Sequence, residues 1–246
     1  MPTVKNGDAT IYYEEFGSGF PILTIAPGSL NATIEAWHRS AAFDPTVELA
    51  GEFRVIAMDQ RNAGGQSWAP ITANDGWHNF TSDHIAVLDH LGIDRCHLLG
   101  QCIGGPLSMN FIKTQPQRVA AAVLCQPSGR IGPDSGRAGG FERWRENLSG
   151  HPEATPEVLD SLRANLYANG FVYTVSRDFV RTVQIPLLVL AGNDEAHPFR
   201  VAEELADLAP NAEFIPEWKT GAALAAALKR IHEFLHAHTP QEATVG

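Results

Sequence analysis

Short apolar runs alternate along the chain with longer segments of helical periodicity, and this alternation constrains the fold more than any other feature. Strands are expected at residues 9–15, 21–26, 54–58, 97–99, 121–125, 186–191 and 212–215. Helices are expected at about residues 81–91, 102–113, 199–208 and 222–237. Such a chain builds a mostly parallel sheet with helices on both faces, so the predicted fold class is α/β.

The length of the chain favours one domain. With 246 residues, 44% of them hydrophobic, the sequence supplies enough apolar side chains for a single large core spanning residues 1–246. Residues 129–185 are rich in Gly, Arg and Asn and contain helical patches but no predicted strand. We therefore predict that this segment is a small helical cap inserted over the sheet.

Charge and cysteine content limit the class of partner. The 28 acidic and 18 basic residues give a net charge of −10, which repels phosphate backbones and anionic membrane surfaces. A small-molecule substrate is the expected partner, with no nucleic acid and no membrane, and the sequence carries no signal for an oligomeric state.

The N-terminal residues lack an apolar secretion signal, and no apolar run is long enough to span a bilayer, so we expect a cytoplasmic protein. The three cysteines are far apart and form no CxxC pair, so we expect no metal and no cofactor.

The segment Gly100-Gln101-Cys102-Ile103-Gly104 follows an apolar strand and precedes a helical run. This pattern is typical of a nucleophile elbow, the sharp strand-to-helix turn that lifts one side chain above the edge of the sheet. Glycines on either side prevent collisions with the adjacent strand and helix. The helix N-terminus also stabilises a thiolate, so Cys102 is the predicted nucleophile, although a small buried core cysteine is the alternative.

Four segments together resemble the α/β-hydrolase superfamily over residues 10–238: Pro27-Gly28-Ser29, residues 59–67 (DQRNAGGQS), the elbow, and residues 186–198 (PLLVLAGNDEAHP). The resemblance implies an α/β-hydrolase fold, with Cys102 as nucleophile and Asp194 as the acid of the triad. It also implies an oxyanion hole formed by the backbone N–H groups of Ser29 and Ile103. The cysteine itself makes the elbow similar to that of dienelactone hydrolases, although the rest of the chain does not look like that group.

The sequence departs from the family pattern at the general base. The family has a histidine after the last strand, where this chain reads Glu217-Trp218-Lys219-Thr220-Gly221. Strand direction excludes most of the ten histidines as the base, because they lie at the wrong ends of strands or helices. The histidines at 232, 236 and 238 are expected to be roughly 15 Å or more from the site.

His197, three residues after Asp194, is the predicted base, with pocket lining or helix capping as its alternative role. His78 is the second candidate and a predicted substrate contact. Lys219 is either a substitute base, a contact for a substrate carboxylate, or a solvated side chain.

These features predict a hydrolase that acts on a small ester, lactone or thioester by acyl transfer through Cys102. One alternative is an acyltransferase or a cofactor-free lyase on the same fold. Analysis of the products with and without an added alcohol or thiol acceptor would separate these reactions from hydrolysis. The other is a ligand-binding protein that has lost catalysis along with the usual histidine.

Overall fold

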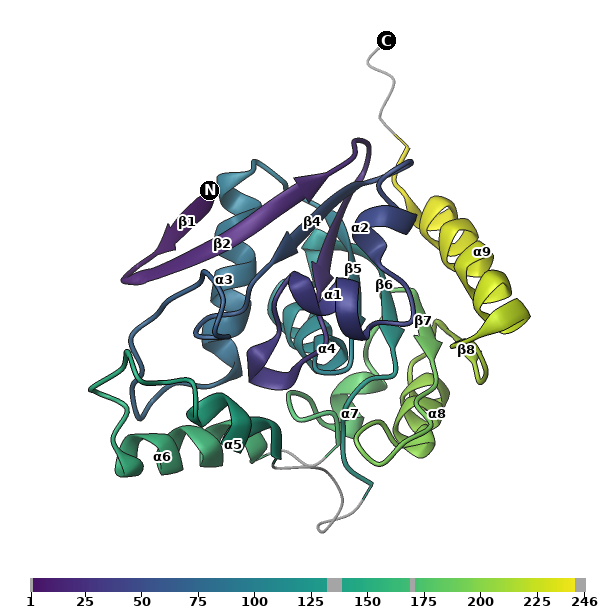
Figure 1. Ribbon diagram of the computed structural model, residues 1–246. Coiled ribbons are helices and arrows are strands. Elements are labelled where there is room, and N and C mark those ends of the chain that lie inside the picture. Colours follow the sequence, from purple (N-terminus) through teal and green to yellow (C-terminus); the bar gives the residue numbers. More distant parts are fainter. Residues whose placement is uncertain (1, 132–138, 169–170, 242–246) are drawn as a thin grey trace.

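The computed structural model describes residues 2–131, 139–168 and 171–241. Its centre is an eight-stranded sheet with the order β1-β2-β4-β3-β5-β6-β7-β8 (Figure 1). The strands are β1 (Thr3–Asn6), β2 (Ala9–Phe16), β3 (Pro21–Ile25), β4 (Arg54–Met58), β5 (Cys96–Gln101), β6 (Val119–Cys125), β7 (Leu187–Leu190) and β8 (Ala212–Ile215). Strands β1 and β2 pair antiparallel, as do β2 and β4, and all other pairs are parallel. The predicted α/β-hydrolase fold with a mostly parallel sheet is confirmed.

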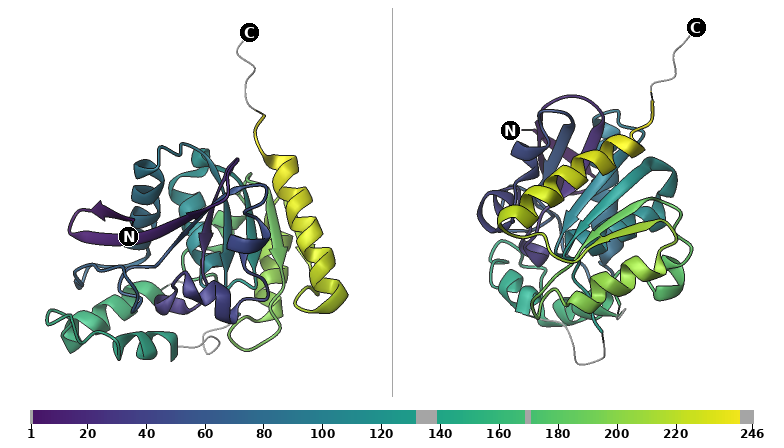
Figure 2. Two further views of the ribbon diagram at one scale, coloured as in Figure 1. Left: turned by 45° about the horizontal axis from the view of Figure 1, so that its top comes forward. Right: turned by 90° about the vertical axis from the view of Figure 1, so that its right-hand side faces the viewer.

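Helices cover both faces of the sheet. They are α1 (Glu35–Ser40), α2 (Pro45–Glu48), α3 (Trp77–His90), α4 (Gly104–Thr114), α5 (Gly139–Arg145), α6 (Pro156–Tyr167), α7 (Arg177–Val180), α8 (Phe199–Leu208) and α9 (Gly221–His238), with short 3₁₀ turns η1 (Ser29–Asn31) and η2 (Pro116–Arg118). Figure 2 shows α9 on one face and α3 with α4 across the sheet from it. No helix among the described residues has both the length and the apolar character needed to cross a lipid bilayer.

The central strands are sequestered from solvent on both sides. Every residue of β6 and β7 is buried, and both are continuous apolar runs, as expected for parallel strands covered by helices on both faces. Strand β5 is longer than predicted because Gly100 and Gln101 continue its pairing with Leu124 and Cys125. The sheet therefore extends up to the residue before Cys102.

The segment predicted as a cap contributes α5, α6 and α7 among its described residues. Residues 132–138 and 169–170 of this segment lie outside the described residues. Helix α5 packs closely on η1, because a Cβ atom on Gly140 would lie only 2.4 Å from the Ser29 Oγ. The interpretation of residues 129–185 as an inserted cap stays a prediction, and these contacts support it.

Candidate active site

The turn between β5 and α4 presents Cys102 in a left-handed backbone conformation, with φ at +59°. A Cβ atom on Gly100 would lie 2.1 Å from the carbonyl oxygen of Gly104, and one on Gly104 would lie 2.2 Å from that of Ile25. Neither approach is compatible with a side chain, so both glycines are required for the turn to close. This strained, glycine-flanked geometry is that of a nucleophile elbow.

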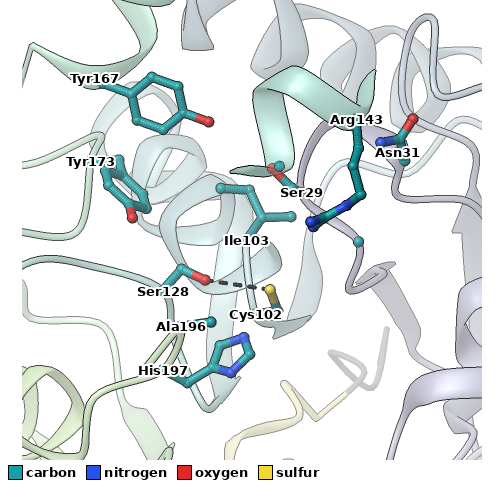
Figure 3. Close-up of a pocket in the computed structure, with 12 residues that line it drawn as sticks. Ser29, Asn31, Cys102, Ile103, Ser128, Arg143, Tyr167, Tyr173, Ala196 and His197 are labelled. Atoms are coloured by element: carbon teal, nitrogen blue, oxygen red, sulfur yellow. Dashed lines mark hydrogen bonds between the residues drawn. The ribbon is translucent and has the colours of Figure 1, made fainter. Parts of the chain in front are cut away.

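The sulfur of Cys102 lies beside two polar side chains (Figure 3). Its Sγ is 3.3 Å from the Ser128 Oγ, and the imidazole of His197 lies next to it. Burial raises the pKa of the thiol, but the neighbouring His197 imidazole, followed by Ser128 and the backbone of Gly28, lowers it by more. The resulting pKa is lowered to about 7, so a large fraction of Cys102 is thiolate at neutral pH.

Asp194 and His197 lie on one loop between β7 and α8. The His197 Nδ1 is 2.9 Å from the Asp194 Oδ1, which also accepts hydrogen bonds from the backbone N–H groups of Ala196 and His197. Burial opposes the charged form of both side chains. The neighbouring His197 nevertheless lowers the pKa of Asp194. In turn, Cys102 and, to a smaller extent, Asp194 raise the pKa of His197. Asp194 thus orients the imidazole through Nδ1 and leaves Nε2 for the thiol.

The loop can fold back in this way because of Gly192. A Cβ atom at this position would lie 2.0 Å from the carbonyl oxygen of His197. The glycine therefore permits the close backbone approach that brings His197 over the carboxyl end of the sheet.

Residues 217–221, where the family has its histidine, contain Trp218 and Lys219 instead. Trp218 is buried, and its indole N–H donates a hydrogen bond to the carbonyl oxygen of Ala191. Lys219 donates to the Asn193 side chain at 2.5 Å, and its Nζ lies 3.9 Å from an Asp194 carboxylate oxygen. Burial lowers the pKa of Lys219, and the charge of Asp194 opposes that shift.

The thiol opens into a cavity of about 320 Å³. Its lining residues are Gly28, Ser29, Asn31, Cys102, Ile103, Ser128, Gly140, Arg143, Tyr167, Tyr173, Ala196 and His197. The rings of Tyr167 and Tyr173 meet edge to face with 5.4 Å between their centroids. Burial raises the pKa of Tyr167 to about 12 and also raises that of Tyr173, so both phenols are neutral hydrogen-bonding groups at neutral pH.

The structure brings most of the sequence-predicted site residues together. Ser29 and Ile103 line the Cys102 cavity, although the backbone that contacts the sulfur belongs to Gly28. His78 does not line this cavity, because it lies at the start of α3 and borders a separate depression beside Arg61. Lys219 borders another depression with Trp218 and reaches the site only through Asp194.

Four further residues line the cavity without having been predicted from the sequence: Ser128, Arg143, Tyr167 and Tyr173. Ser128 comes three residues after the end of β6, the strand next to β5, so its place at the carboxyl edge of the sheet was a usable signal. The other three come from the segment 129–185, where no local pattern indicates which side chains face the sheet.

The other two cysteines differ sharply from Cys102. Cys96 and Cys125 are fully buried in β5 and β6. Burial raises the pKa of Cys96 to about 12 and raises that of Cys125 still further. Both are packing residues of the sheet.

The sheet order and the elbow define an α/β-hydrolase architecture. The family model for the alpha/beta hydrolase fold matches residues 25–149, about half of the chain, and the chain belongs to this family. It is similar to a meta-cleavage product hydrolase from Pseudomonas fluorescens, with a TM-score of 0.72 and 16% identity over 97% of this chain and 98% of that chain. At that identity, the likeness concerns the fold alone.

Curated relatives match shorter parts of the chain. A putative carbamate hydrolase, RutD, of Azorhizobium caulinodans is 31% identical over 127 residues, covering 50% of this chain and 43% of the relative. The carboxylesterase YbfK of Bacillus subtilis is 27% identical over 180 residues, covering 64% of this chain and 60% of the relative. The matches therefore span less than two thirds of either relative.

Proposed function

We propose that this protein is a hydrolase of small esters, lactones or thioesters that transfers an acyl group through the thiol of Cys102. The observation that carries the proposal is the placement of one thiol, with a pKa of about 7, in a cavity beside an imidazole that a carboxylate orients. Acyl transfer requires a nucleophile beside a base, with an acid that orients the base, and Cys102, His197 and Asp194 lie in this arrangement. The description of one relative as a carboxylesterase agrees with this reaction class.

In the acylation step, the Cys102 thiolate attacks the carbonyl carbon, and the carbonyl electron pair moves onto oxygen. We assign the resulting oxyanion to the backbone N–H of Ile103 at the start of α4 and to a second N–H from the loop that contains Gly28 and Ser29. When the tetrahedral intermediate collapses, the bond from the carbonyl carbon to the leaving group breaks, which is C–O in an ester or lactone and C–S in a thioester. The imidazolium of His197 protonates the departing oxygen or sulfur. The product is a thioester on Cys102.

Deacylation uses the same groups in reverse. His197 removes a proton from water, the hydroxide oxygen attacks the thioester carbonyl, and the carbon–sulfur bond breaks to release a carboxylic acid. Asp194 keeps Nδ1 of His197 protonated, so that Nε2 is the nitrogen available to both steps. Thiolate is a good leaving group, so activated carbonyls suit this site better than amides.

Arg143 favours a substrate that carries a negative charge away from its reactive carbonyl. The guanidinium points into the cavity (Figure 3), and no carboxylate among the described residues forms an ion pair with Arg143. A carboxylate on the acyl group of the substrate can therefore pair with it while the carbonyl carbon reaches Cys102. This contact takes the role that the sequence analysis gave to Lys219 as one of its possible functions.

We expect the protein to hydrolyse the 4-nitrophenyl monoester of glutaric acid with a higher kcat/KM than 4-nitrophenyl butyrate. The Arg143→Gln variant should lose about tenfold in kcat/KM for the charged ester, because a hydrogen bond to a charged group is lost. Its kcat/KM for the neutral ester should stay within about twofold of the wild-type value. The matched control is Arg145→Gln on the same helix, which lies outside the cavity lining and should change neither value.

Absence of hydrolysis of both esters by the wild-type protein contradicts the proposed reaction. Hydrolysis with no preference for the charged ester, unchanged in Arg143→Gln, contradicts only the assignment of Arg143.

A further inference from the structure

A second cluster of chemically active side chains lies at the C-terminal part of α9, away from the Cys102 cavity. His232 and His236 are four residues apart, so they project from the same side of the helix. Glu52, in the turn before β4, contacts both histidines, although it is 180 or more residues away from them in the sequence. One ligand-type atom from each of the three side chains lies within 4.8 Å of the other two.

The two imidazoles converge on the carboxylate through defined nitrogens. The His232 Nδ1 lies 3.3 Å from the Glu52 Oε1, and the His236 Nε2 contacts the other carboxylate oxygen of Glu52. The His232 Nδ1 is buried and makes no hydrogen bond to any described residue. The buried ring of Phe53 packs on the His236 imidazole with 4.7 Å between centroids, which restricts the rotation of that ligand.

We propose that Glu52, His232 and His236 form a three-ligand site for a zinc-class divalent ion. Two imidazole nitrogens and one carboxylate oxygen suit Zn²⁺, whereas Ca²⁺ and Mg²⁺ take oxygen ligands. A water molecule would complete a tetrahedral set. The expectation of no metal rested on cysteine spacing, which carries no information about a pair of histidines on one helix.

The sequence around the two histidines is His232-Glu233-Phe234-Leu235-His236, which matches the HExxH pattern of zinc-binding helices. In metalloproteases the glutamate of this pattern acts as a general base. Here Glu233 pairs with Lys229 at 3.7 Å and with Arg230 at 3.5 Å. None of the three proposed ligands lines the Cys102 cavity. We therefore assign the ion a structural role, in which it fastens the end of α9 to the turn before β4.

The test is a zinc titration of chelator-treated protein, followed by calorimetry. All variants carry Cys102→Ala, because the thiol and His197 form a second group that could bind zinc. The parent should bind one equivalent of ZnCl₂, and zinc should raise its Tm, since an ion that binds only the folded state stabilises it. Glu52→Gln and His236→Ala should each weaken zinc binding by more than about tenfold and lose the Tm increase.

The matched control is His238→Ala, which removes a neighbouring imidazole of α9 that faces Phe234. It should keep the stoichiometry and affinity of the parent, and MgCl₂ should give no binding to any variant. Failure of the parent to bind zinc overturns the proposal. Zinc binding of equal affinity in the parent, Glu52→Gln and His236→Ala also overturns it, because the ion then lies elsewhere. Neither result bears on acyl transfer, which the ester assays test with the wild-type thiol.

Discussion

Replacement of Cys102 by alanine is expected to lower kcat for an activated ester by at least about 1,000-fold, because the attacking atom is removed while the rest of the cavity remains. Alanine and cysteine both carry one Cβ atom, so the left-handed turn at this position, with φ at +59°, is no more strained in the variant than in the wild type. The measurement is steady-state release of 4-nitrophenol, with circular dichroism to verify the fold.

Cys96→Ala is the matched control for this experiment. Cys96 is a buried thiol at the start of β5 with no contact to the cavity, and its pKa of about 12 keeps it protonated. Its removal should leave kcat within about twofold of the wild-type value. Equal activity of wild type and Cys102→Ala would rule out acyl transfer through this residue.

The second large effect concerns His197. We expect His197→Ala to lower kcat for the same ester by about 100-fold to 10,000-fold, the usual contribution of a positioned general base. The variant should also shift the pH profile. Contact with His197 lowers the pKa of the Cys102 thiol against the opposing effect of burial, so without the imidazole the pKa rises. The residual activity of the variant should therefore keep increasing with pH well above 7, where the wild-type acylation rate has levelled off.

His78→Ala provides the comparison, since the sequence left this residue as the second candidate. It borders a different depression and should keep both kcat and the pH profile of the wild type. A loss of kcat in His78→Ala together with a normal profile in His197→Ala would reverse the assignment.

The fold was predictable to the extent that burial leaves a pattern in the sequence. Strands β6 and β7 were found because strands covered on both faces are continuous apolar runs. Strand β1 was missed because Thr3–Asn6 is a short edge strand with one buried residue, too little for a periodic signal. Helix α3 begins at Trp77, earlier than predicted, where the Asn79 side chain accepts a hydrogen bond from the N–H of Gly76.

The site was predictable where chemistry is tied to local backbone geometry. The elbow glycines and the strand ends place Cys102 and the Asp194–His197 loop at one edge of the sheet from sequence order alone. By contrast, Arg143 and Tyr173 enter the cavity through packing of the segment 129–185 onto the sheet, and the sequence has no periodic feature that fixes this packing. The direction of the Lys219 side chain likewise depends on its tertiary contact with Asn193.

The most direct test of an activated Cys102 thiol needs no substrate. The rate of alkylation by iodoacetamide is measured against pH, and the modified residues are located by peptide mass spectrometry. We predict that Cys102 reacts with a half-maximal rate near its pKa of about 7, while Cys96 and Cys125 stay unmodified in the folded protein. A half-maximal rate at about pH 8.5 or above, or alkylation of Cys102 as slow as that of Cys96, would contradict the account.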